Sequence, residues 1–194
     1  LLGAMPLVGA GILGAAACGI MGILIPYARV LAAKKPQEYS AWSFLIGLGW
    51  IALGILFLGI MALFVSTPSQ IRVLTMMWLP IIGAGGFAQL FAGALSYLMP
   101  VVIGGGPSVV RIGIAILDWQ FALRVALRNG ALLLQVVLFC AAASTAVTTL
   151  RYALWLVVIM TFAIDIVMFA RAGKNQVRAR RERIKEMSES RQVQ

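Results

Sequence analysis

The sequence contains no histidine, two cysteines and only six acidic residues among 194. Histidine is the commonest general base and metal ligand, so its absence removes both roles. The cysteines, Cys18 and Cys140, lie in different apolar stretches and share no metal-ligand spacing. No paired carboxylates occur, and no nucleophile adjoins a base. We therefore expect a protein that is not itself an enzyme, with no catalytic residue, no metal ligand and no bound cofactor.

Apolar residues dominate the chain. They make up 62% of it, against 11% charged residues, which leaves too little polar surface for a soluble globule of 194 residues. A helix of about 20 apolar residues crosses the ~30 Å hydrocarbon layer, and the alternation of a membrane barrel is absent. The sequence therefore predicts an all-α polytopic membrane protein with five transmembrane helices, near residues 1–25, 42–65, 77–103, 131–147 and 152–170.

The basic residues indicate the orientation. Three lie between spans one and two, three lie between spans three and four, and eight follow span five. The two remaining gaps hold only Arg72 and Arg151. Basic residues stay cytoplasmic in short loops, so we expect the N-terminus outside and the C-terminus inside. This pattern requires a break between spans four and five, which we place at residues 148–151. Residues 1–173 would form the membrane domain and residues 174–194 a basic cytoplasmic tail.

Small residues line span three. Gly85, Gln89, Gly93 and Tyr97 recur at every fourth position and are expected to share a helical face. Membrane helices associate through such small residues, so this face is a candidate for helix packing or partner binding. Gln89 needs a hydrogen-bond partner there, either in a packing contact or in a ligand or proton pathway. Pro80 is expected near the start of the helix.

A glycine-rich turn follows span three. It consists of Gly104, Gly105, Gly106 and Pro107, which must break the helix. It lacks the lysine and Ser/Thr of a phosphate loop. The amphipathic segment 108–129 then predicts a helix along the cytoplasmic interface, either among anionic headgroups or as a solvated connection. Its basic residues are Arg111, Arg124 and Arg128.

Two polar residues inside predicted spans are candidate functional residues. Asp165 is the only acid within a predicted span, and Gln135 lies in span four. Intramembrane polar groups are often functional. We expect Asp165 to pair with Arg171 or with an arginine of the amphipathic segment such as Arg128, either as a structural ion pair or as part of a proton relay.

The tail at residues 174–194 is rich in arginine, lysine, glutamate, serine and glutamine, and it predicts a polar helical extension. Its expected role is to fix the topology and attract anionic lipid headgroups, and no nucleic-acid partner is expected. The basic residues assigned to this role here are Arg171, Arg178, Arg180 and Arg181.

Several motifs resemble a known family. The runs are GFAQL at 86–90, GALSYLMPVV at 93–102, GGGP at 104–107, VR at 110–111 and LRVALRNG at 123–130. They resemble the membrane-integral N-terminal region of actinobacterial copper oxidases, the multicopper-oxidase and copper nitrite-reductase-like proteins in which a polytopic domain precedes cupredoxin domains. The resemblance covers roughly residues 42–171.

The resemblance implies a multi-pass protein of a bacterial plasma membrane. The family holds copper through histidine, cysteine and methionine of its cupredoxin domains, which this sequence lacks, so no copper ligand can be assigned here. Copper would then belong to an attached domain or to a partner. Either the chain continues beyond Gln194, or it is a stand-alone relative of the membrane part.

Three functions remain open at this point. The first is a non-catalytic membrane module that anchors or docks a copper-dependent redox protein. The second is an accessory or assembly subunit of a larger respiratory electron-transport complex, packed against other membrane subunits. The third is a small-solute or ion transporter whose path includes Gln89, Gln135 and Asp165, although no inverted repeat is evident in the sequence.

Overall fold

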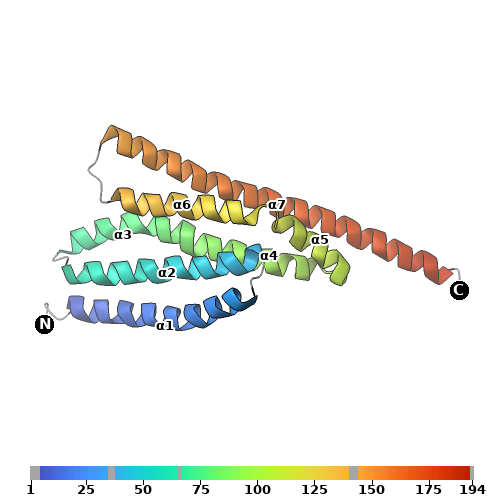
Figure 1. Cartoon of the computed structure of the whole chain (residues 1–194), viewed down its shortest axis with the longest axis horizontal. Helices are drawn as coiled ribbons and strands as arrows, with labels where there is room; N and C mark the ends of the chain where they lie inside the picture. Colours follow the sequence, from blue (N-terminus) through green and yellow to red (C-terminus); the bar gives the residue numbers. More distant parts are fainter. Residues whose placement is uncertain (1–4, 35–37, 65–66, 140–143, 193–194) are drawn as a thin grey trace. The chain divides into compact units, whose positions relative to one another are not determined.

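The computed structural model describes residues 5–34, 38–64, 67–139 and 144–192, and within these ranges it contains helices and short links but no strand. Five stretches are long and apolar enough to cross a membrane, which confirms the expected all-α polytopic membrane protein. The elements in Figure 1 are α1 (Met5–Lys34), α2 (Tyr39–Phe64), α3 (Pro68–Ile82), the π-helix η1 (Gly83–Ala88), α4 (Gln89–Ile103), α5 (Pro107–Leu117), α6 (Phe121–Phe139) and α7 (Thr145–Gln192).

The chain forms two compact units. Unit 1 comprises Leu1–Pro36 and Ala41–Phe91, and unit 2 comprises Gln37–Ser40 and Ala92–Gln194. The boundaries fall inside α2 and α4, so each of these helices contributes residues to both units.

Unit 1 is packed around α2. The Phe57 ring lies against Trp78 of α3, with ring centroids 4.0 Å apart. Glycines let the helices approach closely: a Cβ added at Gly54 would lie 2.4 Å from the Ile82 side chain. At Gly47, an added Cβ would lie 3.0 Å from the backbone nitrogen of Leu90. Small residues thus allow α2 to contact α3 and α4 along its length.

Span three begins earlier than the apolar run predicted. The helix starts at Pro68, a favoured first-turn position, and Pro80 lies inside α3 rather than at its start. The polar residues Arg72 and Thr75 dilute the apolar run there, which is why hydropathy placed the span later. The π-helix η1 follows Pro80 within three residues, and its sequence GAGGFA supplies small residues that accommodate a wider turn.

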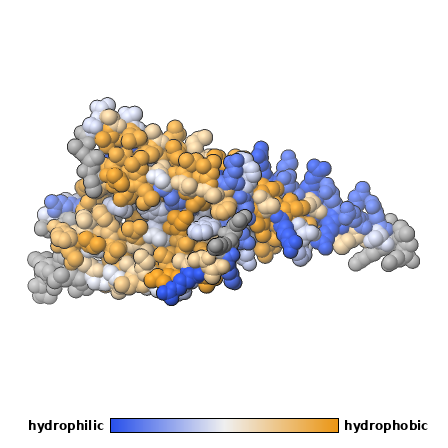
Figure 2. Space-filling model, viewed as in Figure 1, coloured by the Kyte–Doolittle hydropathy of each residue, from blue (hydrophilic) through white to orange (hydrophobic). Residues whose placement is uncertain are grey.

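Unit 2 contains a helical hairpin of α6 and α7, with α5 also packed on α7 (Figure 1). Its apolar core includes Leu117, Met168 and Ala172. Helix α7 has 48 residues and is therefore about 72 Å long, more than twice the hydrocarbon thickness. The tail is helical as predicted, continuous with the span, and hydrophilic residues gather along it (Figure 2).

Two helix breaks differ from the predicted ones. The expected interfacial helix at 108–129 is divided by a turn at residues 118–120, where Gln120 has a φ of 47°. Its second half forms the first turns of span four, which runs over Phe121–Phe139 rather than 131–147. The expected break at 148–151 lies inside α7, because the helix already starts at Thr145 after Ser144. The Ser144 Oγ accepts a hydrogen bond from the Val147 N–H, as helix-capping serines do.

Candidate functional site: a buried ion cluster

Asp165 lies at the centre of a buried cluster in unit 2. Its side chain is held by two guanidinium groups from α6, since Arg124 Nη1 donates to Oδ1 and Arg128 Nη2 donates to Oδ2. All three residues are nearly inaccessible, with exposed fractions of 2%, 4% and 0%. Because Arg124 and Arg128 are four residues apart, both side chains extend from one face of α6 toward α7.

Tyr39, the first residue of α2, completes the contacts of the carboxylate. Its hydroxyl donates to Asp165 Oδ2 over 2.8 Å and accepts a hydrogen bond from Arg128 Nη1 over 3.2 Å. Arg128 Nε donates to Thr161 Oγ1, one turn before Asp165 on α7. The Arg124 guanidinium lies 4.8 Å from the centroid of the Tyr39 ring, and that of Arg128 lies 3.8 Å from the Phe162 ring. Both cations therefore gain aromatic contacts as well as a counter-ion.

Asp118 extends the cluster to the turn between α5 and α6. Its Oδ1 accepts a hydrogen bond from the Tyr39 backbone N–H over 2.7 Å. Burial raises the pKa of the Asp118 carboxyl; the Tyr39 N–H opposes this rise, the charge of Glu38 adds to it, and the Arg124 guanidinium opposes it. Arg124 also donates to the Leu117 carbonyl, the last of α5. We call Tyr39, Asp118, Arg124, Arg128, Thr161 and Asp165 the Asp165 cluster.

The electrostatics of the Asp165 cluster suit helix attachment. Arginine stays protonated in proteins, so two permanent positive charges face one carboxylate whose two oxygens are both bonded. Burying such charges is costly, and the cost is offset only when pairing and hydrogen bonding are nearly complete. Asp165 lies 20 residues after the start of α7, about 30 Å along the helix, so the cluster lies near one end of the span.

The predicted pairing of Asp165 with Arg128 is confirmed, whereas pairing with Arg171 is wrong. Arg171 is exposed, and it lies on α7 six residues after Asp165, away from the face that carries Asp165. Arg124 and Arg128 were expected among lipid headgroups, but both are buried. The physical reason is the early start of α6, which places them inside its first two turns instead of on an interfacial helix.

The predicted face of span three is only partly correct. Gly85, Gln89 and Gly93 are buried, whereas Tyr97 is 58% exposed and Ser96 is buried in its place. A step of four residues turns an α-helix by about 40° more than one full turn, so a four-residue stripe drifts off the buried face. The Gln89 side chain is fully buried, and neither of its polar atoms has a hydrogen-bond partner within the described part of the chain.

Gln135 lies far from Asp165. Its Nε2 donates to the Arg151 carbonyl over 2.7 Å, and its Oε1 accepts from Arg151 Nε over 3.4 Å, which fastens α6 to α7. Arg151 and Asp165 are 14 residues apart on α7, about 21 Å along its axis. The two intramembrane polar candidates of unit 2 therefore belong to separate contacts and do not form one polar path.

The glycine-rich turn is held by α7. Gly104, Gly105 and Gly106 have φ values of 67°, 101° and 92°, which favour glycine, and Pro107 begins α5. The buried Gln176 donates through Nε2 to the carbonyls of Pro100 and Gly104, over 2.5 Å and 3.2 Å.

Two arginines bind the same turn. Arg180 Nη1 donates to the Ile103 carbonyl over 2.9 Å, and Arg183 Nη1 donates to the Gly105 carbonyl over 2.8 Å. Together with Gln176 they occupy one stripe of α7, at intervals of four and three residues. These side chains donate to carbonyls of the last turn of α4 and of the turn that follows it, and the Pro100 carbonyl also accepts from the Gly104 N–H over 3.2 Å. The turn thus contacts the tail helix.

The other basic candidates are surface residues. Each has an exposed side chain on α5 or α7, as a lipid or topology role requires: Arg111, Arg171, Arg178 and Arg181. Cys18 is an exposed, unbridged cysteine of α1, and Cys140 lies outside the described residues.

Sequence analysis did not identify Tyr39, Thr161, Gln176 or Arg183. Tyr39 and Thr161 contact Arg128 across 89 and 33 residues of sequence, and their local sequence carries no sign of this. Gln176 could have been noticed, because it is an uncharged polar residue in a stretch of charged ones and lies on the α7 stripe that contains Ala172.

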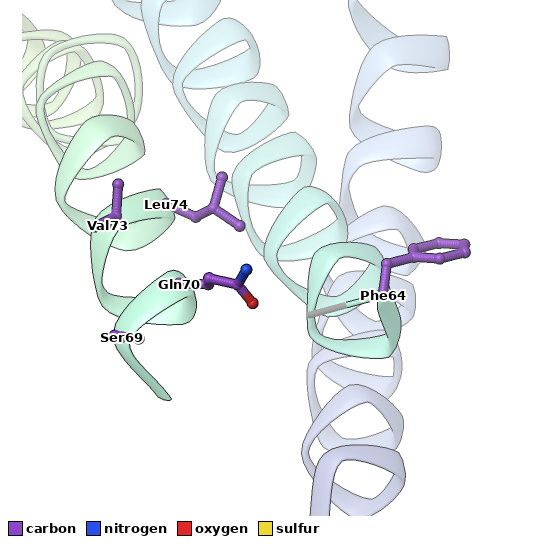
Figure 3. Close-up of a pocket in the computed structure, with 5 residues that line it drawn as sticks. All are labelled: Phe64, Ser69, Gln70, Val73 and Leu74. Carbon is purple, nitrogen blue, oxygen red and sulfur yellow. The ribbon is translucent and has the colours of Figure 1, made fainter. Parts of the chain in front are cut away.

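A groove in unit 1 offers little chemistry. It has a volume of about 450 Å³ and lies between the end of α2 and the start of α3, where the Gln70 side chain points toward α2 (Figure 3). Its described lining residues carry no charge; they are Phe64, Ser69, Gln70, Val73 and Leu74.

Comparison of the chain with protein-family models, with curated proteins and with solved structures finds no match. The function must therefore be argued from the residues themselves. Within the described residues, no three histidine, cysteine, aspartate or glutamate side chains gather into a group that could hold a metal ion.

Proposed function

We propose that this chain is a non-catalytic membrane module that anchors or docks a redox protein at a bacterial plasma membrane. The resemblance of residues 86–130 to the membrane region of copper oxidases suggests that the docked protein is copper-dependent. Copper would be bound by that protein and not by this chain. We infer a cytoplasmic location for the C-terminal half of α7 from the distribution of basic residues.

One observation carries this proposal: both oxygens of Asp165 are bonded to arginines of α6. A proton-relay carboxylate must exchange partners as it gains and loses its proton. Asp165 instead faces two arginine side chains, and its remaining contact is the Tyr39 hydroxyl. This arrangement supports a fixed connection between helices, as a docking module requires.

The transporter alternative has less support. Its candidate path would join Gln135 and Asp165, which are engaged in separate contacts about 21 Å apart along α7. An accessory subunit of a respiratory complex would use the same fixed helices, and it differs from a copper-protein anchor only in the identity of the partner.

The proposal is tested by purifying the chain from its native membrane in mild detergent and measuring the intact mass and bound metal. We expect a mass well above the 20.8 kDa of the chain, with a copurifying redox protein that contains copper. The Asp165→Ala variant should lose this partner, because its helices are no longer fixed. Gly49→Leu is a suitable control, since an added Cβ at Gly49 meets nothing within 4 Å.

Two results would change the conclusion. A complex with respiratory subunits but without copper would favour the accessory subunit. Solute or ion flux by the chain reconstituted alone, lost in a well-folded Asp165→Asn variant, would contradict a docking role and support a transporter.

A further inference from the structure

A groove of about 680 Å³ lies between the C-terminal end of α5 and the middle of α7, entirely within unit 2. One wall is cationic and the other is mainly apolar. The lining residues are Ala115, Ile116, Trp119, Met168, Arg171, Lys174, Asn175 and Arg178. We call it the cationic groove.

The cations of the groove share one face of α7. Arg171, Lys174 and Arg178 are three and four residues apart, so they lie in one stripe about 10 Å long. All three side chains are exposed, and none of the described residues that line the groove is a carboxylate. Arg178 makes one ionic contact, from its Nε to Glu182 Oε1 over 2.9 Å. The groove therefore has an excess of positive charge.

The position of the groove matches a membrane surface. Arg171 is 26 residues after the start of α7, about 39 Å along the helix, just beyond one hydrocarbon thickness. Met168 and Ile116 form the apolar side, and Trp119 is 53% exposed at the edge. Tryptophan prefers the headgroup level of a bilayer, where an apolar region meets a polar one.

We propose that the cationic groove binds the phosphate headgroup of an anionic phospholipid. The phosphate would lie against Arg171, Lys174 and Arg178, and the first part of an acyl chain would follow the apolar side at Ile116 and Met168. Basic pockets between helices at a membrane surface bind such headgroups. This site is specific, because it combines three cations on one stripe of α7 with an apolar wall, whereas a basic tail alone would attract anionic lipid only diffusely.

The test uses the full chain incubated with vesicles of equal amounts of phosphatidylglycerol and phosphatidylcholine. Native mass spectrometry of the chain extracted in mild detergent then counts the lipids retained. We expect preferential retention of phosphatidylglycerol by the wild type. The triple variant Arg171→Gln, Lys174→Gln, Arg178→Gln should lose retention by roughly fivefold per charge removed. The Trp119→Ala variant keeps every charge, so its loss of phosphatidylglycerol retention should be smaller than that of the triple variant.

A charge-matched control separates the groove from general attraction. The triple variant Arg29→Gln, Lys34→Gln, Lys185→Gln removes the same net charge from exposed residues outside the groove, on the same expected side of the membrane. It loses the same diffuse attraction to the bilayer, so it should retain clearly more phosphatidylglycerol than the groove variant. Equal losses in both triple variants, or no lipid preference in the wild type, would overturn the proposal.

Inorganic phosphate distinguishes a lipid from a free ion. Phosphate alone should leave the unfolding temperature unchanged; a rise that disappears in the groove variant would show that the ligand is the free anion, and the lipid proposal would be wrong. The substituted side chains are exposed, so unchanged helicity and unfolding of the groove variant are expected as well. If the groove variant unfolds, the Trp119→Ala variant provides the test instead. Wild-type retention of phosphatidylglycerol by Trp119→Ala would then contradict lipid binding in the cationic groove.

Discussion

Unit 1 and unit 2 hold their helices together in different ways. In unit 1, α2 approaches its neighbours through glycines such as Gly47 and Gly54, and aromatic rings pack beside them. In unit 2, α7 is held by the ion pairs of Asp165, by Gln176 on the glycine-rich turn and by the contact between Gln135 and Arg151.

The difference shows two solutions to one physical problem. Helices in lipid gain little from hydrophobic exclusion, so they associate through close packing or through polar contacts. Close packing is sensitive to volume, and a buried ionic contact is sensitive to charge. Unit 1 should therefore be damaged most by enlarging a small residue, and unit 2 by removing a single charge.

The largest effect is expected from Asp165→Ala. The substitution leaves Arg124 and Arg128 buried without a counter-ion, and uncompensated buried charges of this kind cost about 3–5 kcal/mol. Unfolding by dodecyl sulfate in mixed micelles, followed by circular dichroism, measures this loss. Asp165→Asn preserves the side-chain volume and one acceptor oxygen, so its loss should be smaller.

A triple substitution sharpens this test. Replacing Arg124, Arg128 and Asp165 together by leucine removes every charge at once, and buried ion pairs replaced by apolar residues often lose little stability. The triple variant should therefore be more stable than Asp165→Ala alone. If it is equally unstable, packing of these side chains, and not charge balance, determines the stability of unit 2.

The next largest effect is expected in unit 1, from Gly47→Leu. An added Cβ would lie 3.0 Å from the backbone nitrogen of Leu90 and 3.1 Å from the Gly86 carbonyl oxygen, and backbone atoms cannot rotate away. We expect a loss of about 2 kcal/mol, typical of overpacking. Gly49→Leu makes the same change in helix propensity on the same helix, but at a position where the added Cβ has nothing within 4 Å. Equal stability of the two variants would contradict close packing in unit 1.

Gln176→Leu is expected to lower the free energy of unfolding by a smaller amount, about 1–2 kcal/mol. The substitution removes the donor to the carbonyls of Pro100 and Gly104. It also tests a close contact, because a Cβ added at Gly113 would lie 2.5 Å from Gln176 Oε1. Asn175→Leu removes an exposed amide from the adjacent position and should change stability little. Similar losses in both variants would mean that the turn does not depend on Gln176.

Much of the fold followed from run length and charge, because a membrane span needs a long apolar stretch wherever it lies in the sequence. The breaks were harder to predict. No glycine or proline marks residues 118–120, where Asp118 accepts a hydrogen bond from distant Tyr39. The region 148–151 looked like a turn because it is polar, yet Thr149 Oγ1 donates to the Thr145 carbonyl within the helix.

The candidate site was predictable only at its centre. An acid in an apolar span needs a partner, which identified Asp165 and suggested Arg128. Both of its partners, Arg124 and Arg128, were also assigned to lipid headgroups, because a local pattern cannot distinguish an arginine that faces headgroups from one paired with a carboxylate 41 or 37 residues away. Tyr39 was missed for the same reason, since its contact with Asp165 spans 126 residues.

The smallest effect is expected from Asp118→Asn, in the form of a changed pH dependence. Burial raises the pKa of Asp118, so the folded protein binds this proton more tightly than the unfolded chain. The resulting stabilisation is present at low pH and is lost as pH rises through the folded pKa. The asparagine variant should lack this step and be slightly more stable at neutral pH, because its Oδ1 can still accept the Tyr39 N–H.

Stability of the wild type and Asp118→Asn, measured from mildly acidic to neutral pH, checks this prediction. We expect the pH-dependent change in the free energy of unfolding to be less than about 1 kcal/mol, since the Asp118 carboxyl is only partly buried and solvent screens its charge. Glu38→Gln is the matched variant: it removes the negative charge that helps to raise the Asp118 pKa, so the step should shift to lower pH. If the pH-dependent loss of stability is unchanged in Asp118→Asn, it must arise from another titratable group. Unit 2 would then depend on pH through a residue outside the Asp118 turn.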